Sequence, residues 1–325
     1  MPTKCIRLGA CVLLFSVSLP GTDSAAIGLP TLGYFIRQSP LELRPVRGVP
    51  GAAAIAVPLL LPLGTTQVLV APGQQYAVIE REQEGFAAFL LDGSVPGAII
   101  PIRGAVTAPD FLSFSPSGTS AALVSRAAGR LQVIGALPLA PQLVRDIDIG
   151  VLADVPDCVA VSDDGGSVLY SALGAVYALL PDDSSRLIVA ARRASISFFP
   201  RGAVAAIGDP DAGALWLFKG LAEAAALMAA GLPGLRQMAP SRDGRLLFAT
   251  DGITQRIWTV TVADGSVSEC LLPVIPAQLE PLRSADTFLI SYRPGEPGWI
   301  VFRQAGGLAS VFVPGPPREA RQDIQ

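Results

Sequence analysis

The stretch PSRDGRLLFAT at residues 240–250 decides the fold, and it is followed by RIWTV at 256–260 and ADG at 263–265. Its turn, Ser-Arg-Asp-Gly at 241–244, precedes a run of apolar residues at 246–249. Asp-Gly between two strand-like runs indicates a β-hairpin, because glycine accepts the positive φ that a tight turn needs. The apolar run at 257–262 and the Asp-Gly at 264–265 predict that a second hairpin follows the first.

Turns of the same kind recur along the chain. They end at Gly73, Gly118, Gly165, Gly202, Gly244 and, in degenerate form, Ala285. Successive turns are therefore 45, 47, 37, 42 and 41 residues apart. A repeat of about 40–50 residues is typical of β-propeller blades.

Each turn lies between two apolar runs, and a third run and a weaker fourth run follow it. In one unit these are 159–161, 168–170, 175–180 and 187–191. The segments 34–37, 41–46 and 54–61 fit the second to fourth strands of an N-terminal unit, and 27–32 is a candidate for its innermost strand. We therefore predict an all-β protein, a β-propeller of seven four-stranded antiparallel blades. A six-bladed ring with an N-terminal strap is the alternative.

At 240–265 the sequence resembles the bacterial YVTN and WD40-like β-propeller repeat proteins. The turns FSPSG at 114–118 and VSDDG at 161–165 carry the same resemblance, which covers most of residues 64–313. The Gly-His and Trp-Asp signatures of eukaryotic WD40 blades are absent, since the chain has no histidine. The resemblance implies a fold and not an activity, because one fold hosts many functions.

Two other architectures compete with the propeller. Outer-membrane strands are about ten residues long and alternate strictly between apolar and polar side chains, whereas the runs here are about four to seven residues and apolar at successive positions. A solenoid or a sandwich is the second alternative. Mean hydropathy is high, at +0.49, but prolines at 50, 58 and 62 interrupt one long apolar stretch, and Glu223 and Pro233 interrupt another. We therefore predict no membrane-spanning helix.

Residues 1–26 resemble a secretory signal peptide. Lys4 and Arg7 precede an apolar stretch at 8–19, and Ser24 and Ala26 suit the cleavage site. We expect export to the periplasm or beyond, a propeller domain at 27–315 and a disordered tail at 316–325. A buried first strand or an uncleaved anchor is the alternative. LGAC at 8–11 also resembles a lipobox, although a lipobox cysteine comes after the apolar region, whereas most of the apolar stretch here follows Cys11.

The residue inventory excludes several kinds of chemistry. A net charge of −3 disfavours nucleic-acid binding. Without histidine, the chain has no Ser-His-Asp triad, histidine base or histidine metal ligand, and asparagine is also absent. We predict no cofactor and no metal site. After cleavage only Cys158 and Cys270 would be left, on strands of non-adjacent units, so we expect free thiols.

Paired carboxylates are the catalytic groups that remain possible in this chain. They occur at 146/148, 163/164, 182/183 and 209/211, and we expect all four pairs at hairpins. Asp209-Pro210-Asp211 could begin a calcium loop. The alternative is that each Asp accepts hydrogen bonds from its own turn, and no pair continues into a twelve-residue calcium-loop pattern.

Charged residues recur eight positions before the repeated turns. Asp110, Asp157, Arg193 and Arg236 lie at or beside this position, where one blade connects to the next blade's innermost strand. Equivalent positions of a blade repeat share one height, so these residues should rim one mouth of the central channel. We predict that they bind a protein or a polar small ligand, although solvated loop polarity would give the same pattern.

The favoured function is therefore an exported, monomeric, non-catalytic binding module. Its basis is the repeat fold together with the missing catalytic residue types. The alternative is a carboxylate-based, glycan-active hydrolase or lyase that works in the central channel. It requires two acidic residues about 5–9.5 Å apart across that channel.

Overall fold

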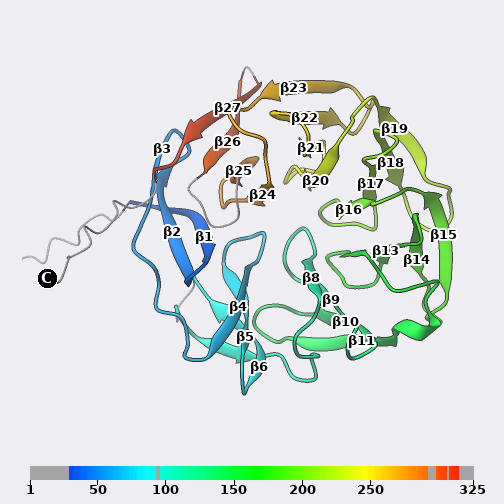
Figure 1. Ribbon diagram of the computed structural model, residues 1–325, viewed down its shortest axis with the longest axis horizontal. Coiled ribbons are helices and arrows are strands. Elements are labelled where there is room, and N and C mark those ends of the chain that lie inside the picture. Colours follow the sequence, from blue (N-terminus) through cyan, green and yellow to red (C-terminus); the bar gives the residue numbers. More distant parts are fainter. Residues whose placement is uncertain (1–28, 93–95, 292–297, 306, 315–325) are drawn as a thin grey trace, which may run out of the picture.

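The computed structural model of the protein describes residues 29–92, 96–291, 298–305 and 307–314. Within them the chain forms seven antiparallel sheets and one 3-10 helix, η1 (Ile149–Val151). The sheets follow one another around a central axis, counter-clockwise in Figure 1. The prediction of an all-β, seven-bladed propeller is confirmed, and the six-bladed alternative is wrong.

We number the blades in chain order and give the strands of each from the innermost outwards. Blade 1 is β1 (Thr31–Gln38), β2 (Leu41–Val49) and β3 (Ala52–Ile55); blade 2 is β4 (Thr65–Val70), β5 (Tyr76–Arg81), β6 (Gly85–Leu90) and β7 (Ile99–Pro101). Blade 3 is β8 (Phe111–Phe114), β9 (Ala121–Ser125), β10 (Arg130–Gly135) and β11 (Gln142–Asp148); blade 4 is β12 (Cys158–Val161), β13 (Val168–Ala172), β14 (Ala175–Leu179) and β15 (Ser185–Ala190). Blade 5 is β16 (Ser195–Phe198), β17 (Ala205–Asp209), β18 (Ala214–Phe218) and β19 (Ala226–Ala230). Blade 6 is β20 (Leu235–Pro240), β21 (Leu246–Asp251), β22 (Arg256–Thr261) and β23 (Val267–Leu271); blade 7 is β24 (Gln278–Pro281), β25 (Thr287–Ser291), β26 (Trp299–Gln304) and β27 (Gly307–Phe312).

The core lies between adjacent blades, where the sheets face each other. The second strands β9, β13 and β17 are buried at every residue, because each is covered on both faces by neighbouring sheets. This is why they are apolar at successive positions and do not alternate. The double coverage also explains the high mean hydropathy of the chain.

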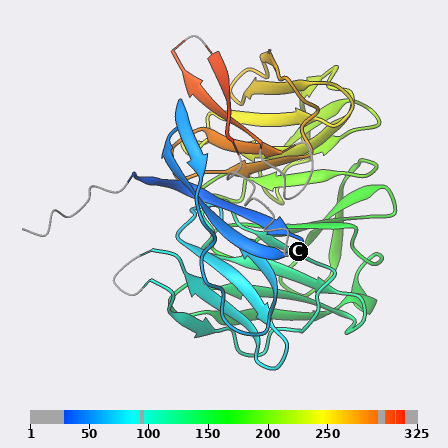
Figure 2. The same ribbon diagram turned by 60° about the vertical axis from the view of Figure 1, so that its left-hand side comes forward.

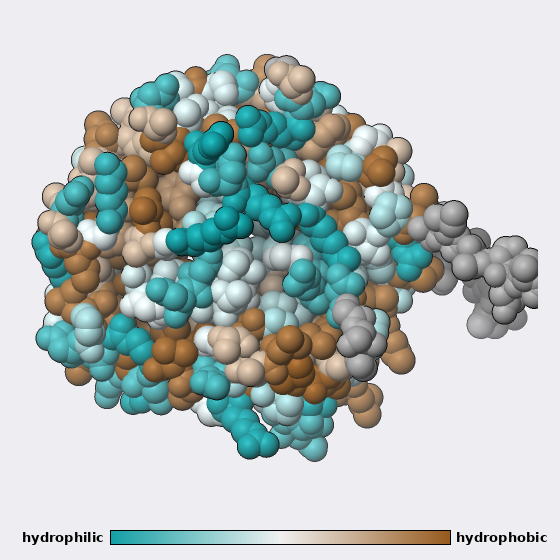
Figure 3. Space-filling model, turned by 180° about the vertical axis from the view of Figure 1, so that it is seen from behind, coloured by the Kyte–Doolittle hydropathy of each residue, from teal (hydrophilic) through white to brown (hydrophobic). Residues whose placement is uncertain are grey.

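The antiparallel strands divide the connections between two faces of the ring. The front face, towards the viewer in Figure 1, carries the blade-to-blade connections and the hairpins between second and third strands. The back face, shown in Figure 3, carries the six repeated turns between first and second strands. Strongly hydrophilic side chains lie around the centre of that back face.

Blade 1 differs from the predicted pattern. Segment 54–61 is not one strand: β3 ends at Ile55, and only an isolated bridge between Leu43 and Leu59 continues the pairing. Thr31 and Leu32 do not belong to a separate innermost strand, because they begin β1. Among the described residues blade 1 therefore has three strands.

The predicted signal peptide at 1–26 and the predicted tail at 316–325 lie outside the described residues. Within the described part of the chain, no helix is long and apolar enough to cross a membrane.

The ring closes between blades 1 and 7 without a shared sheet in the described residues. Figure 2 brings blade 1 to the front and shows β1 and β2 running beside the strands of blades 2 and 7. Leu32, Phe35 and Val46 of blade 1 pack against Leu289 and Ile300 of blade 7. Closure therefore depends on apolar packing and on the hydrogen bonds that accompany it.

Gln74 supplies the polar part of this closure. It is buried, in the turn after β4, and its Oε1 accepts a hydrogen bond from the Tyr34 N–H at 2.8 Å. Its Nε2 donates to the carbonyl of Pro281 at 2.7 Å. One side chain of blade 2 thus joins blade 1 to blade 7.

Candidate binding site on the front face

The four residues predicted for the channel rim are all exposed on the front face. Asp110 and Asp157 directly precede β8 and β12, and Arg193 lies two residues before β16. Arg236 is the second residue of β20, so it belongs to the strand and not to the connection. The structure brings Asp157 and Arg193 together on one pocket, whereas Asp110 and Arg236 lie outside its lining.

Arg126, in the hairpin after β9, connects the two acidic rim residues. Its backbone N–H donates to Asp110 Oδ2 at 2.6 Å. Its Nη2 lies 3.9 Å from Asp157 Oδ1 and donates to the carbonyl of Pro156. The ion pair with Asp157 is long and exposed, so it contributes little to stability and leaves most of the carboxylate of Asp157 available.

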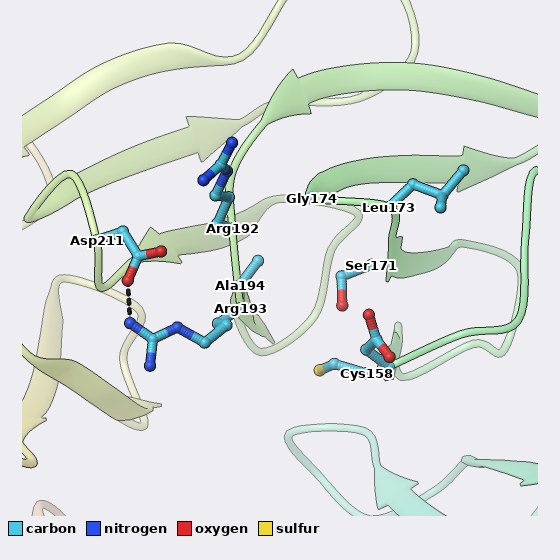
Figure 4. Close-up of a pocket in the computed structure, with 9 residues that line it drawn as sticks. Cys158, Ser171, Leu173, Gly174, Arg192, Arg193, Ala194 and Asp211 are labelled. Atoms are coloured by element: carbon cyan, nitrogen blue, oxygen red, sulfur yellow. Dashed lines mark hydrogen bonds and ion pairs between the residues drawn. The ribbon is translucent and has the colours of Figure 1, made fainter.

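The pocket lies between blades 4 and 5 and has a volume of about 720 Å³. Its polar lining consists of Asp157, Cys158, Ser171, Arg192, Arg193 and Asp211 (Figure 4). This volume falls within the range of about 300–1,000 Å³ that is usual for small-molecule sites.

An ion pair between Arg193 and Asp211 closes one side of the pocket (Figure 4). Asp211 is held in place by its own turn, because its N–H and that of Ala212 both donate to Asp209 Oδ1. The carboxylate of Asp209 therefore accepts hydrogen bonds from its own hairpin, which is the alternative to a calcium loop. Among the residues that the structure describes, no three acidic or cysteine side chains are grouped so that they could share a metal ion.

Ser171 and Cys158 lie opposite this ion pair, and the Ser171 hydroxyl points towards Cys158 (Figure 4). The Ser171 hydroxyl is buried and has no hydrogen-bond partner among the residues that the structure describes. Burial raises the pKa of the Cys158 thiol to about 11, so the thiol stays protonated at neutral pH. A protonated thiol is a poor nucleophile and a poor metal ligand.

Cys158 and Cys270 are free thiols, as predicted. Cys158 lies on the innermost strand of blade 4, and Cys270 on the outermost strand of blade 6. Burial also raises the pKa of the Cys270 thiol.

The acidic pair 146/148 is not at a hairpin, contrary to the prediction. Asp146 and Asp148 belong to β11, and Asp146 forms an ion pair with Arg130 at 2.8 Å on the neighbouring strand β10. The alternation of acidic and apolar residues in DID, at 146–148, is a strand pattern, because successive side chains of a strand point to opposite faces.

Glu280 is an acidic residue that the sequence argument did not single out. On β24, Leu279 packs against blade 6, so the alternating side chain of Glu280 faces blade 1, as does its cross-strand neighbour Leu289. Burial alone raises its pKa from 4.5 to about 7. Five residues before the end of each repeated turn, the other units have Val68, Ser113, Ala160, Ser197 and Ala239. The sequence signal that identifies Glu280 is therefore a charged residue at a repeat position where the other units have small or apolar residues.

No family model and no curated protein sequence matches the chain. Solved structures with a similar fold include two described as a "putative 6-phosphogluconolactonase". The one from Bacteroides fragilis is 14% identical, with 90% of this chain and 97% of that chain covered and a TM-score of 0.56. The one from Bacteroides uniformis is also 14% identical, with 86% and 95% covered and a TM-score of 0.56. A nidogen/laminin complex is 12% identical over 75% of this chain and 93% of that chain, with a TM-score of 0.47. At these identities the similarity shows the propeller fold alone.

Proposed function

We propose that the protein is an exported, non-catalytic binding module that recognises a polar ligand or a protein partner with the front-face rim of its propeller. The observation that carries the proposal is the exposure of Asp110, Asp157, Arg193 and Arg236 on one face, two of them on a pocket of ligand size. The protonated Cys158 thiol and the absence of histidine favour binding over catalysis.

Capture of a partner tests the binding role. Immobilised protein is exposed to periplasmic or secreted fractions of the source cells, and the retained molecules are identified by mass spectrometry. Asp110→Asn, which keeps an oxygen for the Arg126 N–H, and Arg236→Ala should each reduce capture without lowering the melting temperature. Arg245→Ala, on the back face and 85% exposed at the side chain, is the matched control. Equal capture by all variants would refute the role of the rim.

Export has its own test. Expressed with residues 1–26 in a Gram-negative host, the protein should reach the periplasm and begin at Ile27, because the signal peptide is cleaved there. N-terminal sequencing that starts at Met1 would contradict export by this route.

Glu280 favours the second candidate, a glycan-active hydrolase or lyase. A carboxyl group with a pKa of about 7 suits a general acid. Such a reaction also needs a second carboxylate, and no other acidic group contributes to the raised pKa of Glu280. A screen of glycan hydrolysis by the wild-type protein and by Glu280→Gln tests this candidate, and activity that the substitution abolishes would favour it over the binding module.

A further inference from the structure

The pocket between blades 4 and 5 carries one uncommitted charge of each sign. Asp211 is neutralised by Arg193, and the guanidinium group of Arg192 has no hydrogen-bond or ion-pair partner among the described residues. The carboxylate of Asp157 accepts no hydrogen bond there and has only the exposed contact with Arg126 at 3.9 Å. A ligand would therefore meet a free cation from the connection before β16 and a nearly free anion from the connection before β12.

The Ser171 hydroxyl is an independent sign of a ligand. Ser171 lines the same pocket and is 4% exposed, yet its hydroxyl group has no hydrogen-bond partner in the described part of the chain. Buried hydroxyl groups are usually hydrogen-bonded, because an unpaired one loses its bonds to water without replacement. A polar ligand atom at the pocket floor would supply the missing partner.

We propose that this pocket binds a small zwitterion, with its ammonium group on Asp157 and its carboxylate on Arg192. The inference rests on the proposed binding function and specifies its ligand. A purely anionic or cationic ligand would contact only one of the two charges and would leave the other without a partner on the ligand. Asp157 and Arg192 come from the connections before two different innermost strands, β12 and β16, so the two charges of the ligand should be separated by several bonds.

Three probes that differ only in charge test the proposal. Isothermal titration calorimetry of the full chain would use 6-aminohexanoate, N-acetyl-6-aminohexanoate, which has only the anion, and 6-aminohexanamide, which has only the cation. The wild-type protein should bind the zwitterion at least about tenfold more tightly than either analogue, since a charge-assisted contact is worth about 1.4 kcal/mol or more. Glycine, whose two charges are adjacent, should bind more weakly than 6-aminohexanoate.

Two substitutions assign the charges to residues. Arg192→Gln should abolish the preference over the amide and keep the preference over the N-acetyl compound, and Asp157→Asn should do the reverse. Arg245→Gln should change neither preference. The same pattern in both variants, or no preference by the wild-type protein, would overturn the zwitterion.

The experiment separates this inference from the proposed function. If none of the probes binds while Asp110→Asn still weakens partner capture, the zwitterion site is wrong and the binding module stands. If the zwitterion binds with the expected pattern while Asp110 and Arg236 have no effect on capture, the pocket stands and the wider rim is wrong. The comparison of the three probes on the wild-type protein requires no variant to fold.

Discussion

At the scale of single residues, Glu280 places a carboxyl group in a buried position, where ionisable side chains are rare. It lies on an innermost strand with no hydrogen-bond partner among the described residues, and burial raises its pKa to about 7. The folded protein therefore holds this proton more tightly than the unfolded chain does. The resulting stabilisation is fully present below pH 4.5 and is lost as the pH rises to about 7.

Glu280→Gln should remove this pH dependence. The wild-type protein should lose at most about 3 kcal/mol of unfolding free energy between pH 4.5 and 7, from a pKa difference of about 2.5 at 1.36 kcal/mol per unit. The exposed part of the carboxyl group reduces that figure by solvent screening. Urea unfolding at a series of pH values would show a flatter profile for the variant. Identical slopes in the two proteins would mean that the carboxyl group is not desolvated.

Ser171→Ala should separate stability from binding. The substitution removes a buried hydroxyl group that has no hydrogen-bond partner among the described residues, so the unliganded protein should gain up to about 1 kcal/mol of unfolding free energy. Binding of a ligand that uses this hydroxyl should weaken. Thermal unfolding and titration of the same variant measure the two effects, and a lower melting temperature without ligand would show that the hydroxyl has a structural partner.

The front-face position of the four rim residues could be predicted from the sequence, because equivalent positions of a blade repeat lie on the same face of the ring. Ser171, Arg192 and Glu280 could not be assigned in this way. Whether a hydroxyl group or a carboxyl group has a partner depends on the neighbouring blade, which is distant in sequence and, for Glu280 beside blade 1, lies at the other end of the described chain. Their local patterns resemble ordinary strand and loop residues.

At the scale of elements, Asp163 joins the turns of three consecutive blades. Its Oδ1 accepts hydrogen bonds from the N–H and the hydroxyl group of Ser117 in blade 3, at 2.8 and 2.6 Å. Its Oδ2 accepts from the Arg201 N–H in blade 5, at 2.9 Å. Burial acts to raise the pKa of Asp163, but these donors outweigh it and hold the pKa below its usual value.

Asp163→Ala should therefore destabilise the fold by about 2 kcal/mol, because it leaves donors of two other blades without their acceptor. Asp182→Ala is the matched control, since within the described ranges the Asp182 side chain is hydrogen-bonded only in its own turn, to Ser184. Chemical denaturation of the two variants would measure the difference. Equal losses of unfolding free energy in the two variants would show that hydrogen bonds between the turns of different blades stabilise the fold no more than those within one turn.

Turn chemistry explains how far the elements could be predicted. The Asp-Gly and Ser-Gly turns are local, and they mark the first hairpin of blades 3, 4 and 6; the turns that end at Gly73, Gly202 and Ala285 occupy the same place in blades 2, 5 and 7. Blade 1 has no such turn before β1, so its strand boundaries had to come from apolar runs, and the run at 54–61 extends beyond β3. Apolar runs alone do not distinguish a paired strand from a covered connection.

At the scale of the whole molecule, the repeat predicted seven blades but not how the ring closes. The hydrogen bonds of Gln74 to Tyr34 and Pro281 link residues 40 and 207 positions apart. Arg283 adds to them, because its Nη2 donates to the Gln74 carbonyl at 2.9 Å and its Nη1 lies 3.2 Å from Asp92 Oδ2. Contacts of this range leave no periodic signal in a sequence.

Gln74→Ala tests whether this side chain holds the ring closed. The substitution leaves the buried Tyr34 N–H without its partner, at a cost of about 1–3 kcal/mol, and removes the bond to the half-buried Pro281 carbonyl, which costs less. Hydrogen exchange should accelerate in blades 1 and 7 and change little in blades 3 to 5, because opening at the closure need not disturb the opposite side of the ring. Gln75→Ala, at the exposed neighbouring position, should leave exchange unchanged. Faster exchange spread evenly over all seven blades would mean that the ring opens as one cooperative unit and that Gln74 has no special part in closing it.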